Sequence, residues 1–355
     1  MTKITTPSSL TRRHLIQSSI GAAMGGLGLS SYAANEGTGR EGPTSANGGT
    51  GLSTGKDYPN KPIKLIIPLA AGSAVDSAAR IVMQKVSMSL GVGIAIDNQP
   101  GAAGLIGADH VAKSAPDGYT LGGFNDSIMT VLPNLQSKMP WDILRDFDPV
   151  SLVATVEWGL VVPMESSIKT AADLIAKAKH NPTPLTYSSG GNGSPQHISM
   201  ELFASQAKIS MLHVPYKGAT QAAVGVAAQE VDAAFIGLAT VTALAKAGKV
   251  RIIAVTTPTR LAQFAEIPTV TESGLSGFEF NSWFALMAPS GTPKNAIKIL
   301  DTEINKALKD KGVIDQLIAQ GLTPRGVNSA ELIVLLRAQL ARYQALIKQA
   351  SITSD

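Results

Sequence analysis

The chain has 355 residues, of which 44% are hydrophobic, and its 30 Lys and Arg against 26 Asp and Glu give a formal net charge of +4. Lys3, Arg12 and Arg13 lie in the first 34 residues, which contain no Asp or Glu, so the remainder carries 27 minus 26, or +1. With an aromatic content of only 5%, this balance argues against nucleic-acid binding. The length predicts two domains.

Residues 1–34 have the features of an export signal. A basic segment ending in Arg12 and Arg13 precedes an apolar stretch, 15–29, and the small residues 30–34. A membrane-spanning helix needs about 20 consecutive apolar residues, and polar residues and glycines interrupt this stretch. The segment 11–17 resembles a twin-arginine signal, with a general secretory signal as the alternative. We therefore predict export to the periplasm.

The chain contains no cysteine. This excludes disulfides, a thiolate nucleophile, Cys-ligated zinc and a lipid-modified cysteine, so we expect a soluble product without a lipid anchor. Residues 35–57 consist mostly of Gly, Ser, Thr and Asn. They offer too little apolar surface to offset the entropy of ordering, and we predict a flexible leader.

From Tyr58 onward, short apolar runs alternate with amphipathic stretches, which is typical of a mostly parallel sheet flanked by helices. The predicted strands are, in chain order, 63–69, 94–96, 120–124, 160–163, 185–188, 211–214, 233–236, 252–256 and 283–289. The predicted helices are 75–90, 105–113, 196–206, 220–229, 241–247 and 330–348. Ser194-Pro195 and Thr292-Pro293 each place a capping hydroxyl before a proline at the first helical position.

The runs 160–163 and 283–289 bracket a block with its own strand and helix alternation. If both are crossing segments, the chain leaves one domain, builds a second and returns. This predicts two α/β lobes joined by two extended strands, a hinge geometry suited to closing on a ligand. The first lobe is predicted to comprise 58–158 and 282–355, and the second lobe 159–281.

Three predicted loops, 70–76, 188–194 and 216–220, follow strands and precede helices. Ligands of open α/β sheets bind at such loops, where helix N-termini present free N–H groups. Each loop also has a simpler interpretation. Asp76 compensates the helix dipole, the Gly-rich second loop is a flexible turn, and Lys217 in the third is a solvated lysine.

The remaining motifs do not indicate a cofactor, metal or catalytic site. The glycines at 101, 104 and 107 lack the dinucleotide-binding spacing, and we interpret them as a tight turn into a closely packed helix. The five histidines show no metal-ligand spacing, and no G-x-S-x-G nucleophile elbow is present. The sequence thus predicts no metal, no cofactor and no enzymatic activity.

At these same loops the sequence resembles the Bug family, the extracytoplasmic receptors of tripartite tricarboxylate transporters. The similarity extends from Tyr58 to the C-terminal helix. It is carried by the segments 58–76 (YPNKPIKLIIPLAAGSAVD), 98–121, 146–154, 185–197 (LTYSSGGNGSPQH), 213–219 (HVPYKGA) and 267–293. Seven matching pieces in order, counting the closing helix, make the resemblance specific.

The resemblance implies a type II periplasmic-binding-protein fold, with a ligand cleft between the two lobes. It also implies that main-chain amides, hydroxyls and water in the loops matching 69–76, 188–194 and 216–220 hold a small carboxylate. The implied partners are integral membrane transporter subunits, and we expect a monomer.

We predict a ligand with an apolar or aromatic body, because Trp158 and Phe235 stand where the family has smaller or more polar residues. Ser73, in place of a family glycine, adds a hydroxyl. Trp283 is a further candidate for the wall. Trp158→Ala should then abolish binding, whereas packing at the hinge is the alternative role. The candidate ligand-binding residues are Ala70, Ala71, Gly72, Ser73, Ala74, Asp76, Asn125, Ser127, Trp158, Ser188, Ser189, Gly190, Asn192, Gly193, His197, Tyr216, Lys217, Gly218 and Phe235.

Two other functions fit the same sequence. A receptor that reports ligand occupancy to a membrane sensor kinase would use the same fold. A periplasmic hydrolase would use a Ser/His pair that no motif reveals, and would form product from esters or amides.

Overall fold

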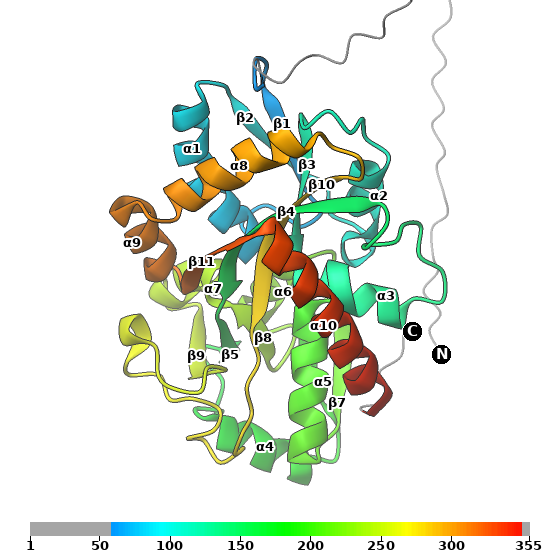
Figure 1. The fold of residues 1–355 in the computed structure, drawn as a ribbon. Coiled ribbons are helices and arrows are strands. Elements are labelled where there is room, and N and C mark those ends of the chain that lie inside the picture. The colour runs from blue at the N-terminus through cyan, green and yellow to red at the C-terminus, as the bar shows by residue number, and fades with distance from the viewer. Residues whose placement is uncertain (1–57, 350–355) are drawn as a thin grey trace, which may run out of the picture. The chain divides into compact units, whose positions relative to one another are not determined.

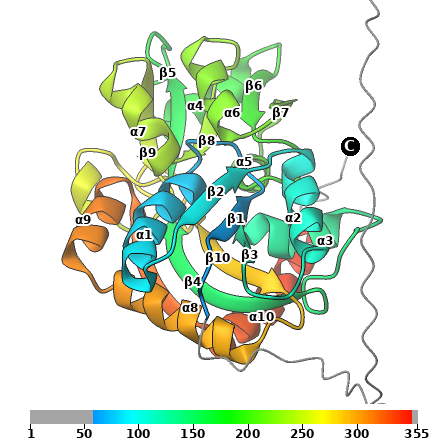
Figure 2. The same cartoon turned by 90° about the horizontal axis from the view of Figure 1, so that it is seen from above.

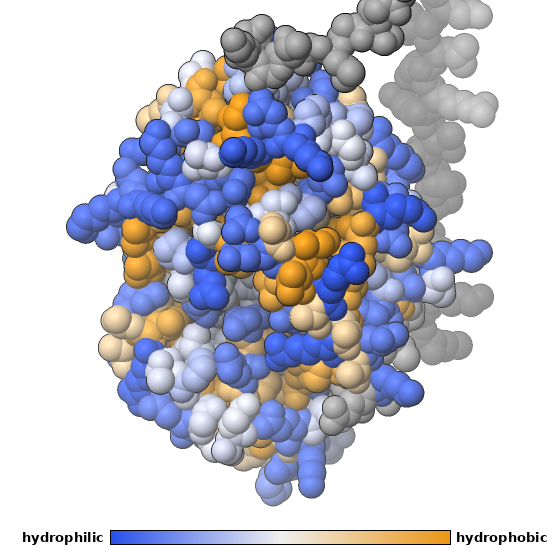
Figure 3. All heavy atoms as spheres, in the orientation of Figure 1, coloured by the Kyte–Doolittle hydropathy of each residue, from blue (hydrophilic) through white to orange (hydrophobic). Residues whose placement is uncertain are grey.

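The computed structural model describes residues 58–349, so the predicted export signal and leader lie outside the described residues. Within this part the strands form two main sheets, and the helices pack around them (Figure 1). None of the helices in this range is long and apolar enough to cross a bilayer. The face in Figure 3 is covered mostly by hydrophilic side chains, with apolar ones gathered near its middle.

The first lobe contains a six-stranded sheet in the order β11-β4-β10-β3-β1-β2. Strand β1 pairs in parallel with β2 and β3, whereas β10 is antiparallel to both β3 and β4, and β11 is antiparallel to β4. The strands are β1 (Ile63–Ile67), β2 (Ile94–Asn98), β3 (Thr120–Asn125), β4 (Phe147–Val156), β10 (Ser282–Pro289) and β11 (Leu322–Asn328).

Helices cover both faces of this sheet because side chains of β1 alternate between two apolar clusters. Ile63, Leu65 and Ile67 belong to the cluster that includes α1 and α8, while Ile66 belongs to the one that includes α2 and α10. Figure 2 shows α1 and α2 on opposite sides of β1 and β2. The helices are α1 (Ala74–Leu90), α2 (Leu105–Ala112), α3 (Leu132–Leu135), α8 (Lys294–Ala307), α9 (Lys311–Ala319) and α10 (Ser329–Gln349), with short turns η1 (Ala102–Gly104) and η2 (Ser127–Val131).

The second lobe contains the antiparallel sheet β8-β5-β9 and the parallel pair β6-β7, joined by a bridge between Tyr187 and Ala233. Its core includes Phe203, Phe235 and Phe278, whose rings pack against one another. The strands are β5 (Trp158–Pro163), β6 (Leu185–Ser189), β7 (Met211–Pro215), β8 (Ala234–Gly237) and β9 (Val250–Val255). The helices are α4 (Ala171–His180), α5 (Pro195–Ala207), α6 (Ala219–Ala227) and α7 (Leu238–Lys246), with the turn η3 (Ala262–Phe264).

The chain passes between the sheets twice, from β4 to β5 through Glu157 and back into β10 at Ser282. The two passages are bonded to each other, since the indole Nε1 of Trp158 donates to the Ser282 hydroxyl at 3.0 Å. This agrees with the predicted two-lobed topology, although the exact lobe limits stay a prediction.

Both predicted helix starts can be checked. Ser194 is the N-cap of α5 and Pro195 its first residue, as predicted. The Thr292-Pro293 prediction is wrong, because α8 begins at Lys294 and the Thr292 hydroxyl donates to the carbonyl of Pro289 instead of capping the helix.

Candidate functional site

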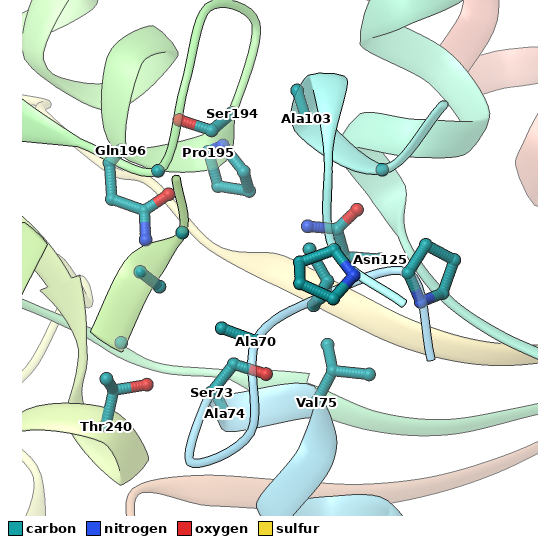
Figure 4. A pocket seen from close by; sticks show the side chains of 18 of the residues that line it. Ala70, Ser73, Ala74, Val75, Ala103, Asn125, Ser194, Pro195, Gln196 and Thr240 are labelled. Carbon is teal, nitrogen blue, oxygen red and sulfur yellow. The ribbon is translucent and has the colours of Figure 1, made fainter. Parts of the chain in front are cut away.

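A cavity of about 50 Å³ lies between the two lobes, and we call it the inner cavity. Its lining residues directly follow the carboxyl ends of several strands, with Pro68 after β1, Asn125 ending β3, Gly190 after β6 and Gly237 ending β8. This is the edge at which open α/β sheets bind ligands. Figure 4 shows labelled side chains of both lobes around it.

Five α-helices begin at the inner cavity. Their N-cap residues all belong to the lining, namely Ser73 of α1, Gly104 of α2, Ser194 of α5, Gly218 of α6 and Gly237 of α7. The first N–H groups of a helix have no partner inside the helix, and its N-terminus carries about half a positive charge. Lys217 is the one charged residue among the described lining residues. The convergence of these helix ends makes the cavity attractive to an anion.

The first loop is held rigid from behind by Asp76. Its carboxylate accepts hydrogen bonds from Arg80 at 2.9 and 3.0 Å, from the backbone N–H of Gly72 at 2.9 Å and from Asn98 at 3.0 Å. Burial raises the pKa of Asp76, but these hydrogen bonds outweigh burial and hold it below its usual value. Asp76 therefore fixes the loop, and its carboxylate is not part of the lining.

The second loop is organised by two stacked histidines. The rings of His197 and His213 lie 4.3 Å apart, and His213 also stacks on Tyr187. Nε2 of His213 is 2.6 Å from the Ser189 hydroxyl, and Nδ1 of His197 accepts from the backbone N–H of Gly193 at 3.1 Å. These contacts shape the loop without placing an imidazole in the inner cavity.

Ser189 and His213 are the kind of pair that the hydrolase interpretation requires, yet Ser189 is fully buried. Its hydroxyl is also engaged with Gly191, and it lines neither the inner cavity nor its mouth. A nucleophile must reach its substrate, so this geometry gives no support to nucleophilic attack. Among residues 58–349, no cluster of three His, Asp or Glu is arranged to hold a metal ion.

The third loop bonds to the first across the cleft. The hydroxyl of Thr220 donates to the carbonyl of Ala71 at 2.8 Å. A second bond of this kind joins the hydroxyl of Ser127 to the carbonyl of Gly193. The loops of the two lobes are thus in direct contact, as expected for a closed cleft.

Three hydroxyl groups of the lining each accept one hydrogen bond from the protein. Ser73 accepts from the N–H of Asp76, Ser194 from the N–H of His197, and Ser282 from the indole of Trp158. Because a hydroxyl that accepts a bond still carries a proton to donate, each can donate to a ligand. The amide of Asn125 has the same character, since its Oδ1 accepts from the N–H of Ile128.

The inner cavity continues into a wider outer cavity of about 690 Å³. Tyr216 and Asn192 line only this outer part. The hydroxyl of Tyr216 donates to Glu230 at 2.6 Å, and burial together with Glu230 raises the pKa of Tyr216 to about 12. Five residues line both cavities, namely Pro100, Gly101, Ala103, Gly190 and Lys217. The exposed Lys217 therefore stands at the mouth.

The predicted site residues separate into three groups. Those in the inner lining are Ala70, Ser73, Ala74, Asn125, Trp158, Gly190, Lys217 and Gly218, and those in the outer lining alone are Asn192 and Tyr216. Outside both linings lie Ala71, Gly72, Asp76, Ser127, Ser188, Ser189, Gly193, His197 and Phe235. The first and second loops each supply three residues of the last group. In the second loop, Ser188 and Ser189 use their hydroxyls for hydrogen bonds within the protein.

The placement of Phe235 is a correction. It is fully buried between Phe203 and Phe278 in the second lobe, because β8 turns this side chain toward α5. Trp283 is also absent from the inner lining and belongs to the apolar core of the first lobe. Of the three aromatic side chains proposed for the wall, Trp158 alone lines the inner cavity.

Sequence reasoning missed several lining residues. Gln196, Thr240 and Ser282 are polar side chains of the lining, while Leu69, Val75, Pro100 and Val156 are apolar ones. The capping pair Ser194-Pro195 marked the start of α5, and this was the available signal that the next residue, Gln196, lies near the ligand.

The model of the family described as "Tripartite tricarboxylate transporter family receptor" matches residues 78–352. BugT of Bordetella pertussis is 32% identical over 293 residues, which cover 82% of this chain and 90% of BugT.

Two solved structures with named ligands are similar over most of the chain. Rpa4515 of R. palustris with adipate is 32% identical, with a TM-score of 0.81 and coverage of 84% of this chain and 99% of that one. MatC (Rpa3494) of Rhodopseudomonas palustris with bound malate is 25% identical, with a TM-score of 0.77 and coverage of 82% and 100%.

Proposed function

Because the chain belongs to the tripartite tricarboxylate transporter receptor family, we propose that it binds a small carboxylate in the inner cavity and delivers it to the membrane subunits of such a transporter. The receptors of this family work outside the cytoplasm. Export by the N-terminal segment would bring this chain to the periplasm, where its ligand and the transporter meet.

The convergence of five helix N-termini is the observation that carries this proposal. Each end contributes about half a positive charge and several unpaired N–H donors. No carboxylate side chain belongs to the described lining to compete for them. Two similar proteins have carboxylates, adipate and malate, in their solved structures, which supports the same class of ligand here.

The body of the ligand would lie on the apolar part of the lining. Trp158, Leu69, Val75 and Val156 contribute hydrocarbon surface to it. Trp158 also bonds to Ser282 and packs edge-on against Phe280, so its indole is fixed in position. A flat, immobile apolar surface favours a ligand with a hydrocarbon segment next to its carboxylate.

Release to the transporter would follow from opening of the cleft. Ligand binding favours the closed state only by as much as it binds that state better than the open one. The bonds from Thr220 to Ala71 and from Ser127 to Gly193 cross the cleft. They would be made on closure and broken on opening, so a transporter subunit that recognises both lobes could sense occupancy.

The test is a thermal unfolding series on the full chain with acetate, hexanoate, adipate, malate, benzoate and citrate. A ligand that binds only the native state at 100 times its Kd raises the free energy of unfolding by about 2.7 kcal/mol. We expect a dose-dependent rise in Tm for a subset of these acids and none for the uncharged control adipamide. Equal effects of adipate and adipamide, or no rise with any acid, would contradict a carboxylate site.

A further inference from the structure

One amide side chain in the inner cavity bonds no other residue of the range that the structure describes. It belongs to Gln196, the second residue of α5, which is 3% exposed. Figure 4 shows this side chain directed into the cavity from the second lobe. Within residues 58–349 the amide makes no hydrogen bond, whereas the backbone carbonyl of Gln196 accepts from the Ser199 hydroxyl.

Neither amide atom of Gln196 is fully enclosed by protein, so the amide reaches the space of the cavity. Buried polar groups in proteins are nearly always hydrogen-bonded, to protein or to ordered water. With no partner among residues 58–349, this amide forms its hydrogen bonds with whatever fills the cavity, either water or a ligand. A ligand that displaces the water must offer the amide an equivalent partner, or it loses affinity.

The surroundings of Gln196 keep its amide in the cavity. A Cβ on Gly190 would lie 3.4 Å from its Oε1 and 3.0 Å from the backbone nitrogen of Ala219. The glycine at 190 thus leaves room for the amide beside the start of α6. Opposite, Figure 4 shows Ala70 and Asn125 of the first lobe across the gap.

The polar side chains on this wall are uncharged. Gln196 and Thr240 both line the cavity, and the exposed Lys217 stands at its mouth. An amide offers two donors and one acceptor, so it complements an oxygen-bearing group such as a hydroxyl, a keto oxygen or a carboxyl. A methyl group in that place would leave the amide unpaired.

We propose that Gln196 is a specificity-determining residue that hydrogen-bonds a second oxygen-bearing group of the ligand. This rests on the proposed carboxylate binding. The helix N-termini of the first lobe, those of α1 and α2, hold one carboxylate, and Gln196 hydrogen-bonds a second group of the ligand from the second lobe. The protein thereby takes bifunctional acids in preference to acids with a purely hydrocarbon body.

The experiment compares matched acids on the wild-type chain and on Gln196→Leu. The pairs are adipate with hexanoate, malate with butyrate, and 3-hydroxybenzoate with benzoate, each measured by calorimetric titration. We expect the wild type to bind the bifunctional member of at least one pair 10-fold or more tightly. Gln196→Leu should reduce that ratio about 10-fold and leave the affinity for the hydrocarbon member nearly unchanged.

Two further readouts separate recognition from a structural role. Gln206→Leu is the matched control, because Gln206 lies on the same helix with its amide bonded to Ser276 away from the cavity, and its affinity ratio should equal that of the wild type. The Tm of ligand-free Gln196→Leu should stay within a few degrees of the wild type, since the amide bonds no other residue within 58–349. A structural glutamine would instead lower the Tm.

Three outcomes overturn the inference. A bifunctional-to-hydrocarbon ratio that stays within twofold in Gln196→Leu refutes the role of Gln196 while the carboxylate site stands. Binding of hydrocarbon acids alone refutes the second group while the carboxylate site again stands. If no acid of any pair binds the wild type, the proposed function itself fails.

Discussion

The two walls of the inner cavity hold their polar groups in different ways. On the first-lobe wall, the loop 68–76 is tied to Asp76, whose oxygens are occupied by Gly72, Arg80 and Asn98. On the second-lobe wall, the amide of Gln196 faces the cavity with no partner among the described residues. The carboxylate that holds the first-lobe loop has hydrogen-bond partners within the protein. The second-lobe wall, in contrast, presents the amide of Gln196 to the cavity without a partner among the described residues.

This difference matches two tasks of a binding site. A rigid set of donors binds an anion without reorganising, because its dipoles already point at the ligand. Specificity needs groups that are satisfied by the right ligand and left unpaired by the wrong one. Both walls contribute helix N-termini that attract a carboxylate, and the second wall adds Gln196, which selects among carboxylates.

The largest expected effect concerns Asp126. This buried carboxylate follows Asn125 of the first wall. Burial raises the pKa of Asp126 to about 7, although hydrogen bonds, among them one from Tyr343 at 3.3 Å, oppose this. The folded state therefore binds the proton more tightly than the unfolded state. The contribution of Asp126 to the free energy of unfolding is therefore fully present below about pH 4, and it is lost as pH rises through about 7.

Asp126→Asn should remove this pH dependence. A shift from 3.8 to about 7 corresponds to roughly 4 kcal/mol, so the free energy of unfolding of the wild type should fall by up to that amount between pH 4.5 and 7.5. The variant should give a flatter profile in urea titrations. Asp310→Asn is the control, since the pKa of Asp310 is lowered by Lys85 and backbone N–H groups. Parallel profiles for wild type and Asp126→Asn would show that Asp126 is ionised in the folded protein.

Asp76→Ala removes the carboxylate that holds the first loop of the first-lobe wall. It leaves Gly72, Arg80 and Asn98 without their acceptor, but the Arg80 side chain is 52% exposed and is partly resolvated. We expect a loss of about 2 kcal/mol in the free energy of unfolding and a roughly 10-fold loss of carboxylate affinity. The lowered pKa of Asp76 means that its contribution is present above about pH 4 and is lost on further acidification.

A matched control exists on a helix remote from the cavity. Asp173 completes the capping box of α4, accepting from the backbone N–H groups of Lys169 and Thr170. Asp173→Ala should lower the free energy of unfolding by about 1 kcal/mol with no change in carboxylate affinity. If both variants keep wild-type affinity in calorimetric titrations, the network behind the first loop does not prepare the anion site.

Sequence patterns anticipated the fold well because strand and helix periods are local. The alternation through 63–90 predicted β1 and α1 closely, and Ser194-Pro195 marked the start of α5. Strand β4 (Phe147–Val156) was missed because its charged start, DFDP, conceals the strand pattern. In the sheet, β10 pairs along the whole of β4, and β11 pairs with its second half, 151–156.

The site was harder to predict because its composition depends on how the lobes meet. Phe235 was assigned to the cavity from its position near a strand end, but neighbouring residues of β8 face opposite sides, and this one faces Phe203. Gln196 was missed because a glutamine in the first turn of a helix is usually on the surface. Its burial arises from long-range packing, which no local pattern records.

The smallest expected effect comes from a place where the two walls meet closely. A Cβ on Gly237 would lie 3.1 Å from Val156 and 3.2 Å from Ala74, at the start of α1. The backbone of Gly237, with φ −56° and ψ 131°, is one that alanine adopts freely, so Gly237→Ala adds no backbone strain. The added methyl group acts as a wedge between the second wall and the first.

Gly237→Ala should therefore hinder closure more than folding. Overpacking by one methyl group costs about 1–3 kcal/mol when the neighbours cannot move. Opening of the cleft relieves part of this cost. We therefore expect roughly a 5- to 10-fold loss of ligand affinity, with a Tm within a few degrees of the wild type. Gly93→Ala is the control, because no atom lies within 4 Å of its added methyl. Small-angle scattering should show a larger radius of gyration for ligand-free Gly237→Ala than for Gly93→Ala. Wild-type affinity and equal radii would mean that the walls tolerate a methyl group between them, and that ligand selection by Gln196 does not depend on tight closure.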